Sequence, residues 1–288
     1  MDKVFAYVIL HYQNMQVTMD CVKSILRYYS NSKIIIVDNC SPNQTGALLK
    51  KEFEGEPRVV VLINDKNKGF AAGNNMGYQY AKKELSPDYI VVSNSDVVFV
   101  QKESETVIDE YMEKNRVDVC GPDIQTPDGG HQNPFAYRPY TTEELNRFIV
   151  SNKKKLLLFK LPGILSLYTR YRRKHAVQLS NPKKEDNSII NCLLHGSFVV
   201  FSKSYIQNEE YAFRPETFMY GEENILYDYL QYRGYRTGYC PDATIIHLGG
   251  KSTGKENLTK EKVLFKFTNI TKSLKIQLNL RKAYETGS

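Results

Sequence analysis

The chain has 288 residues, of which 41% are hydrophobic and 25% are charged. These proportions are those of an ordinary globular protein and exclude a largely disordered chain, and the length can bury one large core or two small ones. The five cysteines are scattered and contain no CxxC pair, which argues against a disulfide framework or a structural zinc site and favours a reducing compartment.

The net charge of +7 comes from one segment of the chain. Eight of the 39 Lys and Arg lie in residues 153–175, which contain no acid, and the remaining 31 basic residues nearly balance the 32 acidic residues. A localised basic segment indicates a localised anionic partner. Because no recognition motif for nucleic acid accompanies the charge, we expect no nucleic-acid partner.

Neither a secretory leader nor a membrane-spanning run is visible in the sequence. The N-terminus leads directly into an apolar run, and no stretch approaches the roughly 20 apolar residues that cross a bilayer. We therefore expect a cytoplasmic protein, either free or held on the inner face of the cell membrane.

The first hundred residues alternate short apolar runs with helical patterns. The apolar runs predict strands at 5–10, 33–38, 58–63 and 88–93, and the helical patterns cover 17–28, 46–53 and 73–84. Strands that alternate with helices predict an α/β fold with a parallel sheet covered on both faces. In such sheets ligands bind beyond the carboxyl ends of the strands.

The second half of the chain is less regular. We expect loops and a short helix over 121–150, a pair of strands within 189–201, a helix over 222–233 and a strand over 244–248. The basic segment 153–175 interleaves leucines with cations, which fits an element lying on an anionic membrane and fits equally a helical pair with a solvated basic face. The last segment predicts a basic helix with a stripe of apolar residues, namely Val263, Phe267, Ile270, Leu274 and Leu278.

Polar residues stand at three successive predicted strand ends. They are the pairs 38–39 and 64–65 and the triplet 94–96, all rich in Asp and Asn. Asp and Asn make good turns, so any one pair is compatible with a turn alone. Three in succession at the ligand-binding edge favour a binding site.

Eight short stretches occur in an order and spacing that are specific together although each is weak alone. They read ILHYQN (9–14), IVDNCS (36–41), NKGFAAGNNMG (67–77), SNSDV (93–97), GSF (196–198), FMYGEE (218–223), GYR (234–236) and PDATIIH (241–247). On these stretches the sequence resembles the family-2 inverting glycosyltransferases, in particular the bacterial rhamnosyltransferase-like group, over about residues 4–100 and 190–253.

The resemblance implies a GT-A-type fold, which is a Rossmann-like αβα sandwich with a mixed, mainly parallel sheet and helical C-terminal additions. It implies one domain over 1–288, with a nucleotide-sugar-binding half (1–120), an acceptor half (121–252) that carries the basic insertion 151–176, and a C-terminal helix (253–288). The implied activity is metal-dependent, inverting transfer of a hexosyl or rhamnosyl group from a UDP- or dTDP-sugar. The acceptor would be a hydroxyl of a growing, lipid-linked surface polysaccharide of the cell envelope.

The resemblance also assigns a nucleotide-sugar site. Asp38 would contact the nucleotide base, since a carboxylate can accept from a pyrimidine N3–H. The glycines of 67–77 read GxxxGxxxG and lack GxGxxG, which argues against a nicotinamide enzyme, and they serve either close helix packing or approach to a nucleotide. The candidate nucleotide-sugar-binding residues are His11, Tyr12, Asp38, Asn67, Gly69, Asn75, Asn94, Ser95 and Gly196.

The metal and the base are assigned in the same way. The triplet 94–96 replaces the family's Asp-x-Asp and leaves Asp96 as the metal ligand, with His247 as the second ligand for Mn²⁺ or Mg²⁺. By the resemblance the general base would be Glu223, with Glu222 as the alternative. In a pair of carboxylates, the charge on one can raise the pKa of the other toward the working pH. The later acid of the family motif is replaced here by Ile225.

Two other function classes remain open from the residues. With a single Asp in the metal motif, the chain could be a non-catalytic nucleotide-sugar-binding scaffold of a glycan-assembly complex. A nucleotidyltransferase shares similar αβα layers but needs a glycine-rich, basic N-terminal loop, and residues 11–15 contain neither glycine nor cation.

Overall fold

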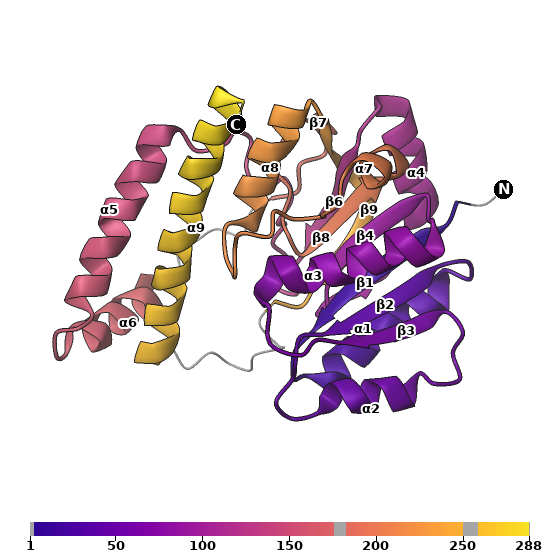
Figure 1. Cartoon of the computed structure of the whole chain (residues 1–288), viewed down its shortest axis with the longest axis horizontal. Helices are drawn as coiled ribbons and strands as arrows, with labels where there is room; N and C mark the ends of the chain where they lie inside the picture. The colour runs from indigo at the N-terminus through magenta and orange to yellow at the C-terminus, as the bar shows by residue number, and fades with distance from the viewer. Residues whose placement is uncertain (1–2, 176–182, 250–258, 288) are drawn as a thin grey trace.

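The computed structural model describes residues 3–175, 183–249 and 259–287, and its centre is one nine-stranded sheet with helices on both faces (Figure 1). The strands are β1 (Phe5–His11), β2 (Lys33–Asp38), β3 (Val59–Ile63), β4 (Tyr89–Asn94), β5 (Val97–Phe99), β6 (Val119–Gln125), β7 (Ile189–Ile190), β8 (Phe198–Ser202) and β9 (Thr237–His247). The helices are α1 (Met15–Tyr28), α2 (Thr45–Glu52), α3 (Gly69–Tyr80), the π-helix η1 (Ala81–Leu85), α4 (Ser104–Asn115), α5 (Thr142–Leu158), α6 (Ile164–His175), α7 (Lys203–Asn208), α8 (Glu222–Arg233) and α9 (Lys260–Thr286). Residue 176 of the expected basic insertion and residues 253–258 and 288 of the expected C-terminal helix lie outside the described residues.

The sheet runs in the order β3-β2-β1-β4-β8-β6-β9-β5, with β7 beside β9. Strands β1 to β4 pair in parallel, and β8 then joins β4 in antiparallel orientation. Further along, β6 is parallel to β9, and β5 is antiparallel to β9. The predicted mixed α/β sheet is confirmed. The carboxyl ends of its parallel strands lie along one edge of the sheet, which is where ligands bind in such folds.

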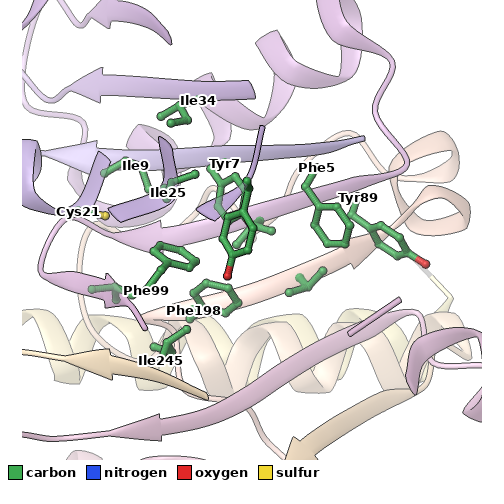
Figure 2. Close-up of a cluster of buried hydrophobic side chains, with 14 of the residues drawn as sticks. Phe5, Tyr7, Ile9, Cys21, Ile25, Ile34, Tyr89, Phe99, Phe198 and Ile245 are labelled. Atoms are coloured by element: carbon green, nitrogen blue, oxygen red, sulfur yellow. The ribbon is translucent and has the colours of Figure 1, made fainter. Parts of the chain in front are cut away.

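The core lies on both faces of this sheet because β1 is apolar on both sides. Phe5, Tyr7 and Ile9 join one buried cluster (Figure 2). Residues of α1 and α4 cover this cluster. Ala6 and Val8 point to the other face and join a second cluster covered by α3, α7 and α8. Strand residues alternate between faces, so a run that is apolar throughout must be buried between two layers.

Helix α3 lies unusually close to the sheet, and Gly77 makes this possible. A Cβ at Gly77 would overlap Cγ1 of Val8 and would lie 2.8 Å from Cγ2 of Val37. The helix begins at Gly69 rather than at the expected residue 73, and the chain continues as a π-helix to Leu85. Gly73 is required by similarly close packing, since a Cβ there would lie 2.7 Å from Cδ1 of Leu10 on β1.

The expectation of loops and a short helix over 121–150 is only partly correct, because residues 126–141 form loops but the segments on either side do not fit it. Residues 119–125 form β6 inside the sheet, and α5 begins at Thr142 and runs for 17 residues. Pro122 and Gly121 read as turn residues in the sequence, but the register of β6 against β9 shifts between Pro122 and Asp123, which accommodates a residue without an N–H. Strand β9 also starts earlier than expected, and β5 and α4 were not predicted.

Helices α5, α6 and α9 form a layer of their own beside the sheet, at the left of Figure 1, and α5 packs along α9. On α9 the expected apolar stripe is only partly buried, and the most buried side chains include the polar Asn269, Thr271, Ser273 and Gln277. Within the described residues, no helix combines the length and apolarity needed to cross a membrane. The basic segment 153–175 lies on the end of α5 and on α6.

We expect Gly77→Ala to lower the free energy of unfolding by about 1–3 kcal/mol, because the new methyl group overpacks against two β-branched side chains of the sheet. The better helix propensity of Ala, worth about 1 kcal/mol, offsets only part of this loss. Denaturant titration measures the difference. Gly55→Ala is the matched control, since a Cβ there has no atom within 4 Å; equal losses in both variants would contradict the packing role of Gly77.

Candidate functional site

A cavity of about 790 Å³ opens beyond the carboxyl ends of β1, β2 and β4. Seven of the predicted site residues line it, namely Tyr12, Asn67, Gly69, Asn94, Ser95, Asp96 and His247. The other lining residues are Leu10, Gln13, Asn39, Phe70, Phe218, Met219, Lys262 and Phe265. The cavity, referred to below as the first cavity, therefore combines amide side chains and aromatic rings with one carboxylate and one imidazole.

Asp96 and His247 meet at the floor of the first cavity although they lie far apart in the sequence. Strand β5 pairs antiparallel with β9 so that Val97 faces His247, and this register brings Oδ1 of Asp96 to 3.1 Å from Nε2 of His247. The other ring nitrogen, Nδ1, lies 2.7 Å from Oε1 of Gln132, to which it can donate. Nε2 is then the nitrogen that can offer a lone pair to a cation beside the carboxylate.

His11 and Asp38 lie behind the cavity rather than in its wall. Both ring nitrogens of His11 are within hydrogen-bond distance of hydroxyls, Nδ1 at 2.7 Å from Thr18 and Nε2 at 2.9 Å from Thr45. Burial lowers the pKa of His11, and the nearby Asp38 opposes this shift. The Asp38 carboxylate accepts hydrogen bonds from the backbone N–H and the hydroxyl of Ser41, so in this structure it holds the turn that follows β2.

Asn39 organises the loop on the far side of this turn. Its Nδ2 donates to Oδ1 of Asn67 and to the carbonyl of Gly69, each at 3.0 Å, and its Oδ1 accepts from the N–H of Lys68 at 2.9 Å. Gly69 has a φ of +80°, and a Cβ there would lie 2.8 Å from the carbonyl carbon of Phe218. Asn39 thus fixes the loop around Gly69, and Gly69 allows the backbone of Phe218, which lines the first cavity, to approach closely.

Asn75, another predicted contact, is a structural clamp in this structure. Its Nδ2 donates to the carbonyl of Phe213 at 2.7 Å, and its Oδ1 accepts from the N–H of Phe213 at 3.0 Å. Asn75 is buried on α3 and does not line the first cavity. It ties α3 to the segment that leads toward Phe218.

A second cavity of about 590 Å³ lies between α5, α8 and α9. It is lined by Phe135, Tyr140, Phe148, Asn152, His195, Tyr220, Gly221, Glu223, Asn224, Lys266, Ile270, Ser273, Leu274 and Gln277. The His195 ring also lies 5.7 Å from the His247 ring, measured between centroids, so His195 stands between the two cavities. Burial lowers the pKa of His195 to about 4, and its Nδ1 accepts from the N–H of Ser197, which leaves a neutral ring with its proton on Nε2.

Glu223 presents its carboxylate to the second cavity at the start of α8. The space for it exists because residue 196 is glycine: a Cβ at Gly196 would lie 2.9 Å from Oε1 of Glu223. Burial raises the pKa of Glu223, and hydrogen bonds from its own N–H and that of Gly196 partly oppose the shift. The structure thus brings the predicted residues Gly196 and Glu223 together, outside the first cavity.

Glu222 points elsewhere and is more deeply buried. Its side chain lines neither cavity, and the residue is 5% exposed. Burial raises its pKa from the usual 4.5 to about 7, with the neighbouring Glu223 as the second cause. At neutral pH, Glu222 is therefore partly protonated and Glu223 is the carboxyl group with access to a ligand.

Sequence reasoning missed several residues of these cavities. Gln132, which orients His247, lies in a segment expected to be a loop, and no motif marks it. Lys262 and Phe265 line the first cavity from the start of α9, a helix seen in the sequence only as an apolar stripe. Asn39 was visible beside Asp38 at a strand end, and that position was the signal that could have identified it.

Glu222→Gln should remove a pH-dependent loss of stability. Because the folded-state pKa of Glu222 is raised, its stabilising contribution is present below about 4.5 and is lost as the pH rises through about 7. Between pH 5 and pH 8 the wild type should lose on the order of 3 kcal/mol more unfolding free energy than the variant. Denaturant titration at both pH values measures this, with the exposed Glu52→Gln on α2 as control, and identical pH dependence in wild type and Glu222→Gln would contradict it.

Comparison with known proteins identifies the family. The family model described as "Glycosyl transferase family 2" matches residues 7–177, more than half of the chain. "Glycosyltransferase GlyG" of Streptococcus pneumoniae serotype 4 (strain ATCC BAA-334 / TIGR4) is 30% identical over 122 residues, which cover 42% of this chain and 39% of that protein. The match therefore spans about two fifths of the length of this curated relative.

Two solved structures share the fold at low sequence identity. S. aureus TarS 1-349 superposes with a TM-score of 0.51 and 12% identity over 92% of this chain and 71% of that chain. GalNAc-T7 with UDP, GalNAc and Mn²⁺ gives a TM-score of 0.56 and 14% identity over 85% of this chain and 44% of that chain. The GT-A-type architecture expected from the sequence is confirmed, and the chain belongs to glycosyl transferase family 2.

Proposed function

We propose that this protein transfers one sugar, with inversion, from a UDP- or dTDP-sugar to a hydroxyl of a growing, lipid-linked bacterial surface glycan at the cytoplasmic side of the membrane. The observation that carries the proposal is the pair of adjoining cavities. One contains the carboxylate and imidazole of Asp96 and His247, and the other contains the carboxylate of Glu223. A donor with an anionic leaving group and an acceptor with a hydroxyl need these two environments side by side.

The first cavity suits a nucleoside diphosphate sugar. Its apolar and aromatic walls, which include Tyr12 and Phe218, can hold a base, and amides such as Asn39 and Asn67 can bind ribose or sugar hydroxyls. The predicted contact of Asp38 with the base stays a proposal. In the structure, the Asp38 carboxylate accepts a hydrogen bond from the hydroxyl of Ser41. In this proposal residues 1–120 bind the donor, and residues 121–252 with the C-terminal helix complete the acceptor side of a single catalytic domain.

The residues at the floor of the first cavity fit a divalent metal ion. Asp96 supplies an oxygen and His247 a ring nitrogen, a set that suits Mn²⁺ or Mg²⁺. Among the described residues no group of three or more His, Cys, Asp or Glu could hold a metal, so diphosphate oxygens and water would complete the coordination. When bound, the ion neutralises charge on the diphosphate leaving group. Lys262, which lines the same cavity, adds a second positive charge for the diphosphate.

Glu223 is the general base in this proposal. As the acceptor oxygen bonds to the anomeric carbon, its proton moves to the Glu223 carboxylate, and the nucleoside diphosphate leaves from the opposite face of the sugar. The raised pKa makes the carboxylate a stronger base than an exposed one. His195, neutral and fixed by Ser197, fills the space between the base and the metal pair without adding charge.

Replacing the proposed base should separate catalysis from binding. Glu223→Gln is expected to lower the rate of sugar transfer by about 10²–10⁴-fold while nucleotide affinity stays unchanged, because the amide cannot take the proton. The measurement is release of the nucleoside diphosphate from the donor in the presence of lipid-linked bacterial glycans. Glu222→Gln, the neighbouring isosteric change, should remain active. Full activity of Glu223→Gln with an inactive Glu222→Gln would transfer the base role to Glu222, and a wild type without turnover would favour a binding scaffold.

Metal-dependent nucleotide binding tests the donor site. In calorimetric titrations of UDP and dTDP with and without Mn²⁺, we expect Asp96→Ala to abolish the effect of the metal. Lys262→Ala should weaken binding by about tenfold through the loss of one charge and keep the metal dependence. Asp242→Ala is the control, because Asp242 is an exposed carboxylate on the same strand as His247. If neither nucleotide binds with the metal present, the assignment of the donor site is wrong.

A further inference from the structure

The end of α5 and the beginning of α6 carry a concentration of positive charge that the proposed chemistry does not use. Residues 145–184 contain eleven Lys and Arg and no acid. Lys153, Lys154, Lys160 and Arg170 are exposed, and within the described ranges of the chain none of them forms an ion pair. A solvated face would normally mix charges of both signs.

Large apolar side chains are exposed among these cations. The exposed fractions are 66% for Leu157, 48% for Leu158, 55% for Leu161 and 64% for Leu167. We call residues 153–170, which include these leucines and the four cations, the tip segment. A cluster of exposed leucines marks an interaction surface, and leucines interleaved with unpaired cations match the polar and apolar layers of a lipid surface.

The leucines are not the residues that hold the tip segment in place. Phe159 is 3% exposed, and its ring lies 4.9 Å from that of Tyr168 and 5.6 Å from that of Phe267 on α9, between centroids. Lys155 places its Nζ 5.2 Å from the centre of the Phe267 ring. These contacts attach the tip segment to α9 and leave the leucines free for another surface.

We propose that the tip segment docks on an anionic lipid bilayer, with its leucines at the boundary of headgroups and acyl chains and its lysines at the lipid phosphates. A nucleic acid would use the cations but not the leucines, so the combination favours a membrane. No helix in the described part of the chain could cross the bilayer, which fits docking at the surface.

The position of the tip segment links docking to the second cavity, a link that rests on the proposed function. Phe148 and Asn152 on α5 line that cavity, and Leu157 follows Asn152 by five residues, or about 7.5 Å along the helix. On α9, Lys266 lines the cavity beside Phe267, which anchors the tip segment. A bilayer at the tip segment would therefore bring a glycan on a lipid carrier close to Glu223.

Flotation of the full chain with lipid vesicles tests the proposal without requiring activity. We expect binding to vesicles of phosphatidylcholine mixed with phosphatidylglycerol and little binding to phosphatidylcholine alone. Lys153→Glu/Lys154→Glu and Leu157→Ser/Leu161→Ser should each reduce binding by about tenfold or more. The first variant loses positive charge at the lipid phosphates, and the second loses apolar contact with the acyl chains. The matched controls lie on α2, where Lys50→Glu/Lys51→Glu changes an exposed lysine pair and Leu48→Ser changes a leucine that is 52% exposed.

Each outcome decides the proposal. Loss of vesicle binding in both tip variants, with the α2 variants unchanged and all variants equally resistant to thermal unfolding, supports it. A wild type that does not float with anionic vesicles overturns it, and so does a leucine variant that binds as well as the wild type. Equal binding of the wild type and the leucine variant to a short RNA would then assign the surface to a polyanion. Because UDP titration is independent of vesicle binding, failure of the proposed donor chemistry would leave this result unchanged and would be recognised separately.

Discussion

The pairing of β5 with β9 is the constraint on which the candidate site depends. It places Val97 opposite His247 and so brings together Asp96, in the turn after β4, and a residue 151 positions later. The backbone supports the same arrangement, since the N–H of Leu248 donates to the carbonyl of Asp96 at 2.8 Å. A change in this register by one residue would turn His247 to the other face of the sheet and separate the pair. The metal chemistry proposed here is therefore a consequence of strand register rather than of a local motif.

Helix α9 connects the parts of the molecule that the proposed reaction needs. Its first turns contribute Lys262 and Phe265 to the first cavity, its middle contributes Lys266 and Ile270 to the second, and Phe267 anchors the tip segment. Two of the buried polar side chains on this helix, Ser273 and Gln277, line the second cavity. Asn269 and Thr271, which are also buried, each donate from the side chain to a backbone carbonyl one turn earlier on α9. A movement of α9 would therefore change the shape of both cavities at once.

The sequence predicted the parallel half of the fold well because β1, β2 and β4 are buried on both faces and read as continuous apolar runs. It failed at β6, where Pro122 is tolerated by a register shift that only the neighbouring β9 can provide. The candidate site shows the same division. Tyr12, Asn94 and Asp96 lie at or just after the ends of strands in the parallel half and line the first cavity, whereas Lys262 reaches the cavity, and Gln132 reaches His247, through tertiary packing that no local pattern records.

The two acids at the start of α8 illustrate how position separates their properties. Glu222 and Glu223 are adjacent in a first helical turn, where the helix dipole favours negative charge on both. Burial nevertheless raises the pKa of each, and Gly196 gives only Glu223 both a backbone N–H donor and the space to face a cavity. Because burial and the neighbouring Glu223 raise the pKa of Glu222 to about 7, the pair need not carry two negative charges at neutral pH. A cost in stability at Glu222 thus accompanies an accessible, partly desolvated carboxylate at Glu223, which is the arrangement that a general base requires.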